Sequence, residues 1–272
     1  MTQTVPIRPD LQVPRSRHCR YAGHVTTEAV LDRPMLAGED LREPGGTCGP
    51  EFEQANALFH QGRFEEALAG YRRVRSHHPG SVAALINGSA ALAKLERLDE
   101  ALADLDIALQ KEPHDRAALY NRGRVNALRR SFSDALRDLD LLLALEPHDA
   151  AGLEARGGVL LEMEEPEQAL DAFDQSIQAD PNWAPVHYNR AKALNKLART
   201  QEALQSVERA LELEPGLEVA RDLRRRLMRS RMEELAREGS VRWSGKKPQL
   251  PHHRVNPSPG PPPSEWIVSN RR

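Results

Sequence analysis

A strict 34-residue period dominates the sequence. Five alanines recur at this one interval, and a proline follows each of them at the same distance on its C-terminal side. The alanines are Ala67, Ala101, Ala135, Ala169 and Ala203, and the prolines are Pro79, Pro113, Pro147, Pro181 and Pro215. A period of this length, kept over five units without a slip, indicates a repeat architecture in which each unit packs on its neighbours.

Each unit carries the pattern of two helices joined by a turn. Apolar residues recur at intervals of three and four on both sides of the alanine. The alanine methyl group permits a close approach of two helix axes, and the residue four positions later is large. These large residues are Tyr71, Leu105, Leu139, Phe173 and Val207. The sequence therefore predicts that small and large side chains face each other in every unit.

The ends of the helices are also marked. Proline removes an amide donor and biases the residue before it away from helix, so each of the five prolines is expected to follow the end of a second helix. Two residues further on, Ser81, Asp115 and Asp149 offer side-chain oxygens that can cap the next helix. The same position holds Trp183 and Leu217 in the last two units, and neither side chain can do so.

These units resemble the tetratricopeptide repeat (TPR). Besides the alanine and the proline, the eighth position of that repeat is small, and here it holds Ala55, Ser89, Gly123, Gly157 and Ala191. The twenty-seventh position should also be small, and Val74 and Leu142 depart from it. The resemblance extends from Cys48 to Pro215 and implies an all-α fold, the α-α superhelix of a TPR solenoid. It does not name a function, because this scaffold serves many unrelated processes.

The expected organisation has four parts. Residues 1–47 form a disordered N-terminal segment, 48–215 the TPR body, 216–238 a basic capping helix, and 239–272 a proline-rich disordered tail with an apolar end. The repeats are expected at 48–81, 82–115, 116–149, 150–183 and 184–217. The capping helix is needed because a solenoid must cover the apolar face of its last unit.

Composition points away from catalysis and secretion. The chain contains no phosphate-binding glycine loop, no zinc-protease motif and no nucleophile elbow, so we expect no enzyme, no cofactor and no metal site. Only Cys19 and Cys48 are present, which excludes a disulfide framework. With neither a long apolar run nor a secretory signal, a cytoplasmic protein without membrane contact is expected.

The TPR resemblance implies where a partner binds. In that family the first helix of each unit lines a concave groove, and groove-facing positions here are rich in asparagine, aromatic residues and cations. They are Phe52, Asn56, Phe59, Asn87, Lys94, Tyr120, Asn121, Arg124, Tyr188, Asn189, Lys192, Asn195 and Lys196. Carboxamides can pair with an extended peptide backbone, and the cations favour an acidic or C-terminal peptide. The main hypothesis is a non-catalytic adaptor or scaffold that binds a peptide segment of a partner protein.

An alternative function lies in the C-terminal region. Residues 48–215 carry 19 basic against 28 acidic side chains, a net charge of −9, whereas residues 216–272 carry 13 against six, a net charge of +7. Trp266, Ile267 and Val268 form an apolar motif near the end of this basic arm. The arm resembles the partner-wrapping arms of bacterial antitoxins, or it binds nucleic acid or another polyanion. It could equally dock on the acidic solenoid of its own chain.

Overall fold

The computed structural model describes residues 49–240 of the 272-residue chain. The predictions for residues 1–47 and for the motif Trp266, Ile267 and Val268 lie outside the described residues. The chain divides into two compact units, Met1–Arg231 and Met232–Arg272. All of the contacts discussed below lie in the first unit, and the described residues of the second continue the last helix.

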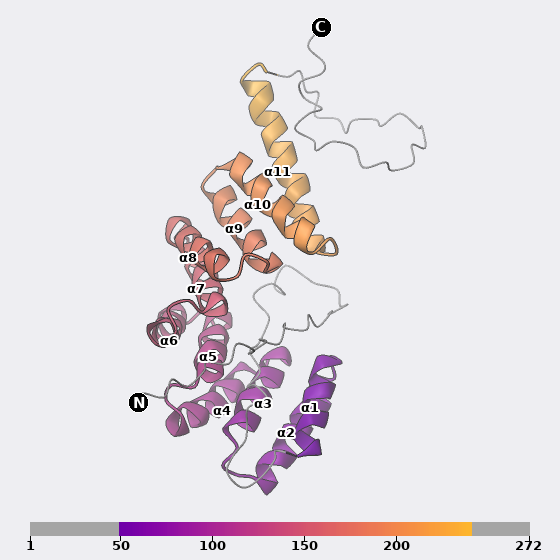
Figure 1. Ribbon diagram of the computed structural model, residues 1–272, viewed down its shortest axis with the longest axis vertical. Helices are drawn as coiled ribbons and strands as arrows, with labels where there is room; N and C mark the ends of the chain where they lie inside the picture. Colours follow the sequence, from indigo (N-terminus) through magenta and orange to yellow (C-terminus); the bar gives the residue numbers. More distant parts are fainter. Residues whose placement is uncertain (1–48, 241–272) are drawn as a thin grey trace, which may run out of the picture. The chain divides into compact units, whose positions relative to one another are not determined.

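The described residues form eleven α-helices, and the first ten pack as five consecutive pairs (Figure 1). The first helices of the pairs are α1 (Pro50–His60), α3 (Val82–Lys94), α5 (Arg116–Leu128), α7 (Ala150–Glu162) and α9 (Ala184–Lys196). The second helices are α2 (Phe64–His77), α4 (Leu98–Lys111), α6 (Phe132–Leu145), α8 (Pro166–Ala179) and α10 (Thr200–Leu213). The chain ends its described part with α11 (Glu218–Arg237). The predicted all-α TPR superhelix is confirmed.

The predicted helix ends are confirmed. Every second helix stops two residues before its proline, as α2 does at His77 before Pro79. The side chains of Ser81, Asp115 and Asp149 each accept a hydrogen bond from the backbone N–H three residues later, at 3.3, 2.7 and 2.7 Å. Trp183 stands at the same place before α9 without a capping bond.

The turn inside each pair uses a left-handed residue. The fifteenth position of all five repeats has a positive φ, but only the first is glycine. The residues are Gly62, Glu96, Arg130, Glu164 and Ala198. In three repeats the arginine that follows pairs with a glutamate one turn into the second helix, as Arg63 pairs with Glu66 at 2.5 Å. A backbone conformation that L-residues avoid is therefore built into four of the five turns.

Close packing inside each pair follows the predicted small-to-large rule. Ala67, Ala101 and their three equivalents are completely buried, and so are the five large residues four positions later. A Cβ atom added to Gly157 would lie 2.6 Å from the Phe173 ring, so only glycine fits there without a shift. Leu142, which departs from the family pattern, fits because Gly152 of the next repeat leaves it room: an added Cβ would lie 2.9 Å from Leu142 Cδ2.

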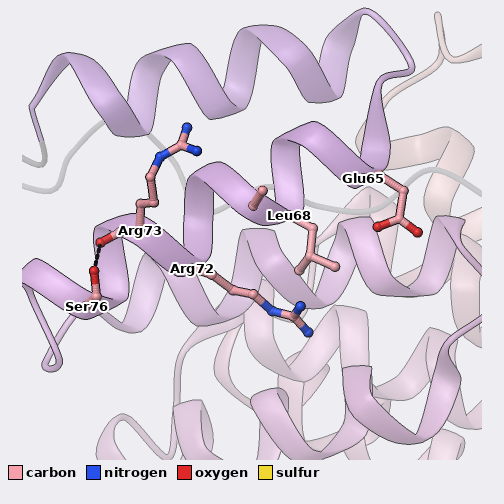
Figure 2. A pocket seen from close by; sticks show the side chains of 6 residues that line it. Glu65, Leu68, Arg72, Arg73 and Ser76 are labelled. Atoms are coloured by element: carbon pink, nitrogen blue, oxygen red, sulfur yellow. Dashed lines mark hydrogen bonds between the residues drawn. The ribbon is translucent and has the colours of Figure 1, made fainter.

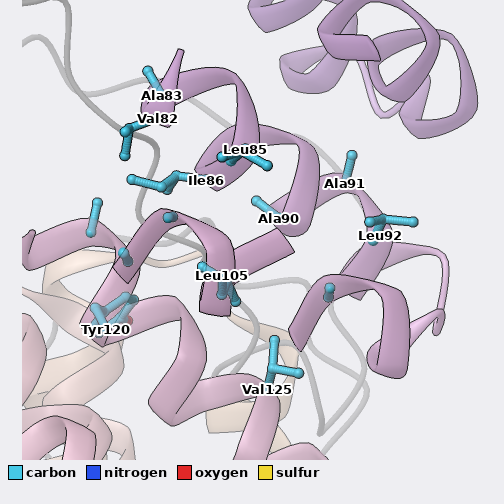
Figure 3. Packing of buried hydrophobic residues seen from close by; sticks show 14 of the residues in the cluster. Val82, Ala83, Leu85, Ile86, Ala90, Ala91, Leu92, Leu105, Tyr120 and Val125 are labelled. Carbon is cyan, nitrogen blue, oxygen red and sulfur yellow. The ribbon is translucent and has the colours of Figure 1, made fainter. Parts of the chain in front are cut away.

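The second repeat is packed most completely. Every residue of α3 from Val82 to Leu92 is buried. Figure 3 shows its apolar side chains, Leu85 and Ile86 among them, in the cluster that also contains Leu105 of α4 and Tyr120 of α5. Because α3 contacts helices of both neighbouring repeats, it carries the apolar core across two junctions.

Charged ladders join neighbouring repeats. Arg122, Arg156 and Arg190 occupy the same position in successive repeats, and each reaches back to an aspartate on the preceding second helix, at distances of 2.5 to 2.8 Å. Arg122 also binds Asp138 of its own repeat at 2.7 Å, and that aspartate is 4% exposed. Since a guanidinium can hold two carboxylates in a fixed geometry, the ladder fixes the stacking of successive units.

Helix α11 covers the fifth repeat. Val219, Ala220, Leu223 and Leu227 are buried in the apolar cluster that also contains residues of α9 and α10. Leu235, which the sequence places on the same apolar side, lies in the second unit and is only partly buried.

Candidate peptide-binding wall

The first helices form one continuous surface, which we call the concave wall. Successive first helices contact each other, α1 with α3, α3 with α5, α5 with α7 and α7 with α9. Contacts of that extent do not join successive second helices within residues 49–240. The first helices therefore lie on the inside of the curve, where a TPR solenoid offers its binding surface.

The predicted groove residues lie on α1, α3, α5 and α9. Most of them are buried: Phe52, Phe59, Asn87, Tyr120, Asn121, Arg124, Tyr188 and Asn189. Asn56, Lys94 and Lys192 are half-buried, and Asn195 and Lys196 are exposed. The sequence predicted no residue of α7, although this helix forms the middle of the C-terminal half of the wall.

At the N-terminal end, the asparagines hold the wall together. The Tyr71 hydroxyl donates to Asn56 Oδ1 at 2.8 Å, and Asn87 Nδ2 donates to the same oxygen at 2.9 Å. The Phe52 ring meets the Tyr71 ring edge-on at a centroid distance of 5.8 Å. Burial raises the pKa of the Tyr71 hydroxyl above its ordinary value, so this group stays neutral. Asn56 thus serves as an acceptor inside the fold.

At the C-terminal end, the wall contains a buried carboxyl group. Glu154 of α7 is 3% exposed, and Asn189 Nδ2 of α9 donates to its Oε1 at 2.5 Å. Burial raises the pKa of Glu154 to about 7, against the opposing effects of the Asn189 hydrogen bond and of the Arg124 and Lys192 charges. The carboxyl group is therefore close to half-protonated at neutral pH.

The charges of two cations act on this carboxyl group, and each cation lies over a tyrosine ring. The Arg124 guanidinium is 5.5 Å from the centroid of Tyr120, and Lys192 Nζ is 5.8 Å from that of Tyr188. Burial lowers the pKa of Lys192, while the charges of Glu162 and Glu154 act in the opposite direction. Cation–π contacts of this kind help to offset the loss of hydration of a partly buried cation.

The exposed cation of the predicted set is already paired. Lys196 Nζ lies 2.6 Å from Glu164 Oε2, on the turn that follows α7. The pairing leaves Lys192 as the cation of α9 that has no carboxylate within ion-pair distance among residues 49–240.

One hydrogen-bonding atom of the wall has no partner in the described structure. Asn189 Oδ1 is buried, and no donor within residues 49–240 reaches it, because the amide group is turned so that Nδ2 binds Glu154. A buried acceptor without a donor is costly, so Asn189 holds the Glu154 carboxyl group at the expense of its own oxygen.

Helix α11 adds a further cation beside this end of the wall. Arg226 follows Lys192 at an interval of one repeat, and the charges of Arg226 and Asp222 both act on the Tyr188 hydroxyl. The sequence predicted a basic capping helix here, with polyanion binding as an alternative, and no part in the groove. The sequence does contain a signal for this position, because Arg226 lies one repeat period after Lys192. The same interval separates Arg124, Gly158 and Lys192.

The surface hollows do not mark a single deep site. The larger, about 410 Å³, runs along α2 and is lined by Glu65, Leu68, Arg72, Arg73 and others of the same helix (Figure 2). A smaller hollow of about 10 Å³ lies between α3 and α5 and brings together the predicted residues Lys94, Asn121 and Arg124. The α2 hollow contains none of the predicted residues. It is lined by one helix alone, so it cannot enclose a ligand on several sides.

The described structure lacks two other kinds of feature. Within residues 49–240, no three His, Cys, Asp or Glu side chains gather in a way that could hold a metal ion. Within the same residues, no helix has both the length and the apolar character that crossing a membrane requires.

Comparison with known proteins places the chain in a family. A family model described as tetratricopeptide repeat matches residues 52–103, 88–150, 128–184 and 155–218. The chain therefore belongs to the tetratricopeptide repeat family, whose members generally mediate protein–protein interactions and are typically non-catalytic. No curated protein matches the sequence.

Solved structures agree with the fold. The thermophilic TPR protein TTC0263 of Thermus thermophilus is 20% identical, with a TM-score of 0.61 over 67% of this chain and 99% of that one. A chain of the APC/C hetero-tetramer Cut9–Hcn1 is 19% identical, with a TM-score of 0.60 over 65% of this chain and 35% of that one. A TPR protein of Parabacteroides merdae is 18% identical, with a TM-score of 0.54 over 71% and 77%.

Proposed function

We propose that the protein is a non-catalytic adaptor whose concave wall binds an extended, acidic peptide segment of a partner protein. The observation that carries the proposal is the C-terminal half of the wall, where Lys192 and Arg124 lie over tyrosine rings and Lys192 has no carboxylate within ion-pair distance among residues 49–240. A carboxylate of a bound peptide supplies the partner that Lys192 lacks there.

The asparagines at the N-terminal end of the wall, which the sequence predicted to bind the peptide, have a structural role in this proposal. Asn56 and Asn87 bind each other, and Asn56 also binds Tyr71, so their hydrogen bonds already stabilise the solenoid. The proposed specificity therefore comes mainly from Lys192, which is half-buried and has no carboxylate within ion-pair distance among residues 49–240.

The test is selection of peptides on the full-length protein, followed by binding titrations. Peptides of about twelve residues from a display library are selected, and their affinities are measured against Lys192→Glu. Because this change reverses a charge on the wall, we expect a loss of about tenfold or more. Arg73→Glu on α2, a helix outside the concave wall, is the matched control, since Arg73 is exposed and has no carboxylate within ion-pair distance among residues 49–240.

The proposal fails if the selected peptides bind Lys192→Glu and wild type equally well. It also fails if Arg73→Glu weakens binding as much as Lys192→Glu, because binding would then reflect overall charge. Circular dichroism of both variants establishes that each retains the helical content of the wild type.

A second candidate function is binding of nucleic acid through α11. From Glu218 to Arg231 this helix carries six arginines and two acidic residues. Arg221 and Arg225 pair with Glu218 and Asp222, whereas three arginines have no carboxylate within ion-pair distance among residues 49–240. They are Arg224, Arg226 and Arg229. Cations gathered along one helix can form such a contact.

The second function predicts a strong dependence on salt. Substitution of Arg224 and Arg229 by glutamine should reduce binding of a DNA duplex and flatten the slope of log affinity against log salt by about 2. Arg226 is left in place because it lies beside the wall, so retained binding of the selected peptides by this double variant separates the two candidate functions. An unchanged slope would remove the second one.

A further inference from the structure

We propose that Glu154 is a built-in competitor for the cations of the concave wall. An acidic side chain of a bound peptide takes the place of the Glu154 carboxylate opposite Lys192, so the wall binds acidic peptides more tightly when Glu154 carries a proton. This inference rests on the proposed function and adds to it a mechanism that makes binding depend on pH.

Burial and position support the competitor role. Glu154 is 3% exposed, lies in the middle first helix of the C-terminal half of the wall, and receives a hydrogen bond from Asn189 at 2.5 Å. A buried carboxylate is normally retained only with a partner charge or donors. Here it has one donor, and the cations Arg124 and Lys192 act on it through space from α5 and α9.

The surroundings of Glu154 favour exchange over a fixed ion pair. No cation within residues 49–240 lies within ion-pair distance of the Glu154 carboxylate, in contrast to Arg122, which binds Asp138 at 2.7 Å. Lys192 is half-buried and holds its charge against a Tyr188 ring. The attraction between Lys192 and Glu154 is therefore present without the geometry of a tight pair, and an incoming carboxylate can replace it.

Protonation of Glu154 changes the charge of this part of the wall by one unit. The charged groups that act on the carboxyl are Arg124 from α5 and Lys192 from α9, and Lys192 in turn is affected by Glu162 of α7 and by Lys196. From α6 and α8, the other two helices that pack on α7, no charged group within residues 49–240 acts on it. Burial places the pKa of Glu154 at about 7, so the change falls in the neutral range.

The ligand is thereby specified by chemistry. It presents a carboxylate side chain to Lys192, which lies over the Tyr188 ring. Aspartate and glutamate side chains of an exposed peptide have pKa values of about 4, so they stay ionised while Glu154 titrates. Binding of such a peptide and ionisation of Glu154 are then linked, and each disfavours the other.

The test uses the full-length protein and two labelled, end-capped peptides of alternating residues, one of Glu and Ala and one of Gln and Ala. We expect the wild type to bind the Glu peptide about fivefold more tightly at about pH 6 than at about pH 8, and Glu154→Gln to bind it tightly at both. Asp171→Asn, which removes an exposed charge from α8, is the matched control and should keep the wild-type pH dependence. Lys192→Gln should abolish the preference for the Glu peptide.

The outcomes separate this inference from the proposed function. If Glu154→Gln keeps the pH dependence, or binds no more tightly than wild type at about pH 8, Glu154 is not a competitor. If the Glu peptide shows no preference over the Gln peptide while library-selected peptides still depend on Lys192, the inference is wrong and the adaptor function stands. If the selected peptides do not depend on Lys192 either, the adaptor function itself fails.

Discussion

Two asparagines at the same position of the repeat, Asn87 in α3 and Asn189 in α9, reach back to the preceding first helix and find different partners there. Asn87 donates to the amide oxygen of Asn56 at 2.9 Å, and Asn189 donates to the carboxyl group of Glu154 at 2.5 Å. Both bonds join successive first helices, but the first partner cannot ionise in the neutral range and the second can. The hydrogen bond at the N-terminal end of the wall is thus independent of pH in the neutral range. The one at the C-terminal end involves a carboxyl group whose charge changes with pH.

The comparison shows how a repeat can acquire a new property without a change of fold. In α5 and α9, the residue equivalent to Glu154 is a tyrosine, Tyr120 or Tyr188, and both rings are buried. A carboxyl group occupies the same place in α7 because Asn189 supplies a donor and two cations supply charge. The change costs stability when the group is ionised, because burial opposes ionisation.

The largest effect expected is the pH dependence of stability that the buried Glu154 adds at the C-terminal end. The folded-state pKa of Glu154, about 7, lies above the ordinary value of 4.5. The folded state therefore holds an extra proton between these values, and the stabilisation present below about 4.5 is lost as pH rises through about 7. The difference in unfolding free energy is about 3 kcal/mol. Urea unfolding of wild type and Glu154→Gln at about pH 5 and about pH 8 measures it.

Asp171→Asn is again the control, because it removes a carboxylate that is exposed on α8. Glu154→Gln should lose part of the wild-type slope, whereas the control should retain it. If the unfolding free energies of wild type and Glu154→Gln change with pH in parallel, Glu154 has an ordinary pKa. The proposed difference between the two ends of the wall would then be wrong.

A smaller loss, independent of pH, is expected at the N-terminal end. Asn56→Ala removes the acceptor of the Tyr71 hydroxyl, which lies in the packed interior, and should cost about 2 kcal/mol. Tyr71→Phe deletes one bond but leaves the Asn87–Asn56 pair, and should cost about 1 kcal/mol. Thermal or urea unfolding at two pH values gives both numbers. A loss for Asn56→Ala that varies with pH would contradict the expectation that no group titrates in the neutral range at this end.

Most of the fold could be predicted because its determinants are periodic. The alanine and proline of each unit, the large residue after the alanine and three of the caps all recur with the repeat, and their roles depend on neighbours close in sequence. The ladder of Arg122, Arg156 and Arg190 has the same period and could have been found in the same way.

The site was less accessible from sequence, for a physical reason. Glu154 looks like an ordinary surface charge because glutamate is common on helices, and its burial depends on Asn189, a whole repeat away on another helix. Likewise, Asn56 and Asn87 were expected to face a ligand, and only their mutual distance shows that they bond to each other. Periodicity assigns a residue to a helix face, but it does not say which neighbour occupies its hydrogen bonds.

The smallest effect concerns the turns at the two ends of the solenoid, where Gly62 and Ala198 have φ values of +77° and +56°. Gly62→Ala should lower the unfolding free energy by about 1 kcal/mol, and this is a backbone effect because an added Cβ meets nothing within 4 Å. Ala198→Gly should raise it by about 0.5 kcal/mol, since relief of strain exceeds the greater entropy of glycine in the unfolded chain. Urea unfolding of both variants at one pH tests the pair. If both substitutions destabilise, contacts of the Ala198 side chain outweigh the strain, and the two turns are not equivalent.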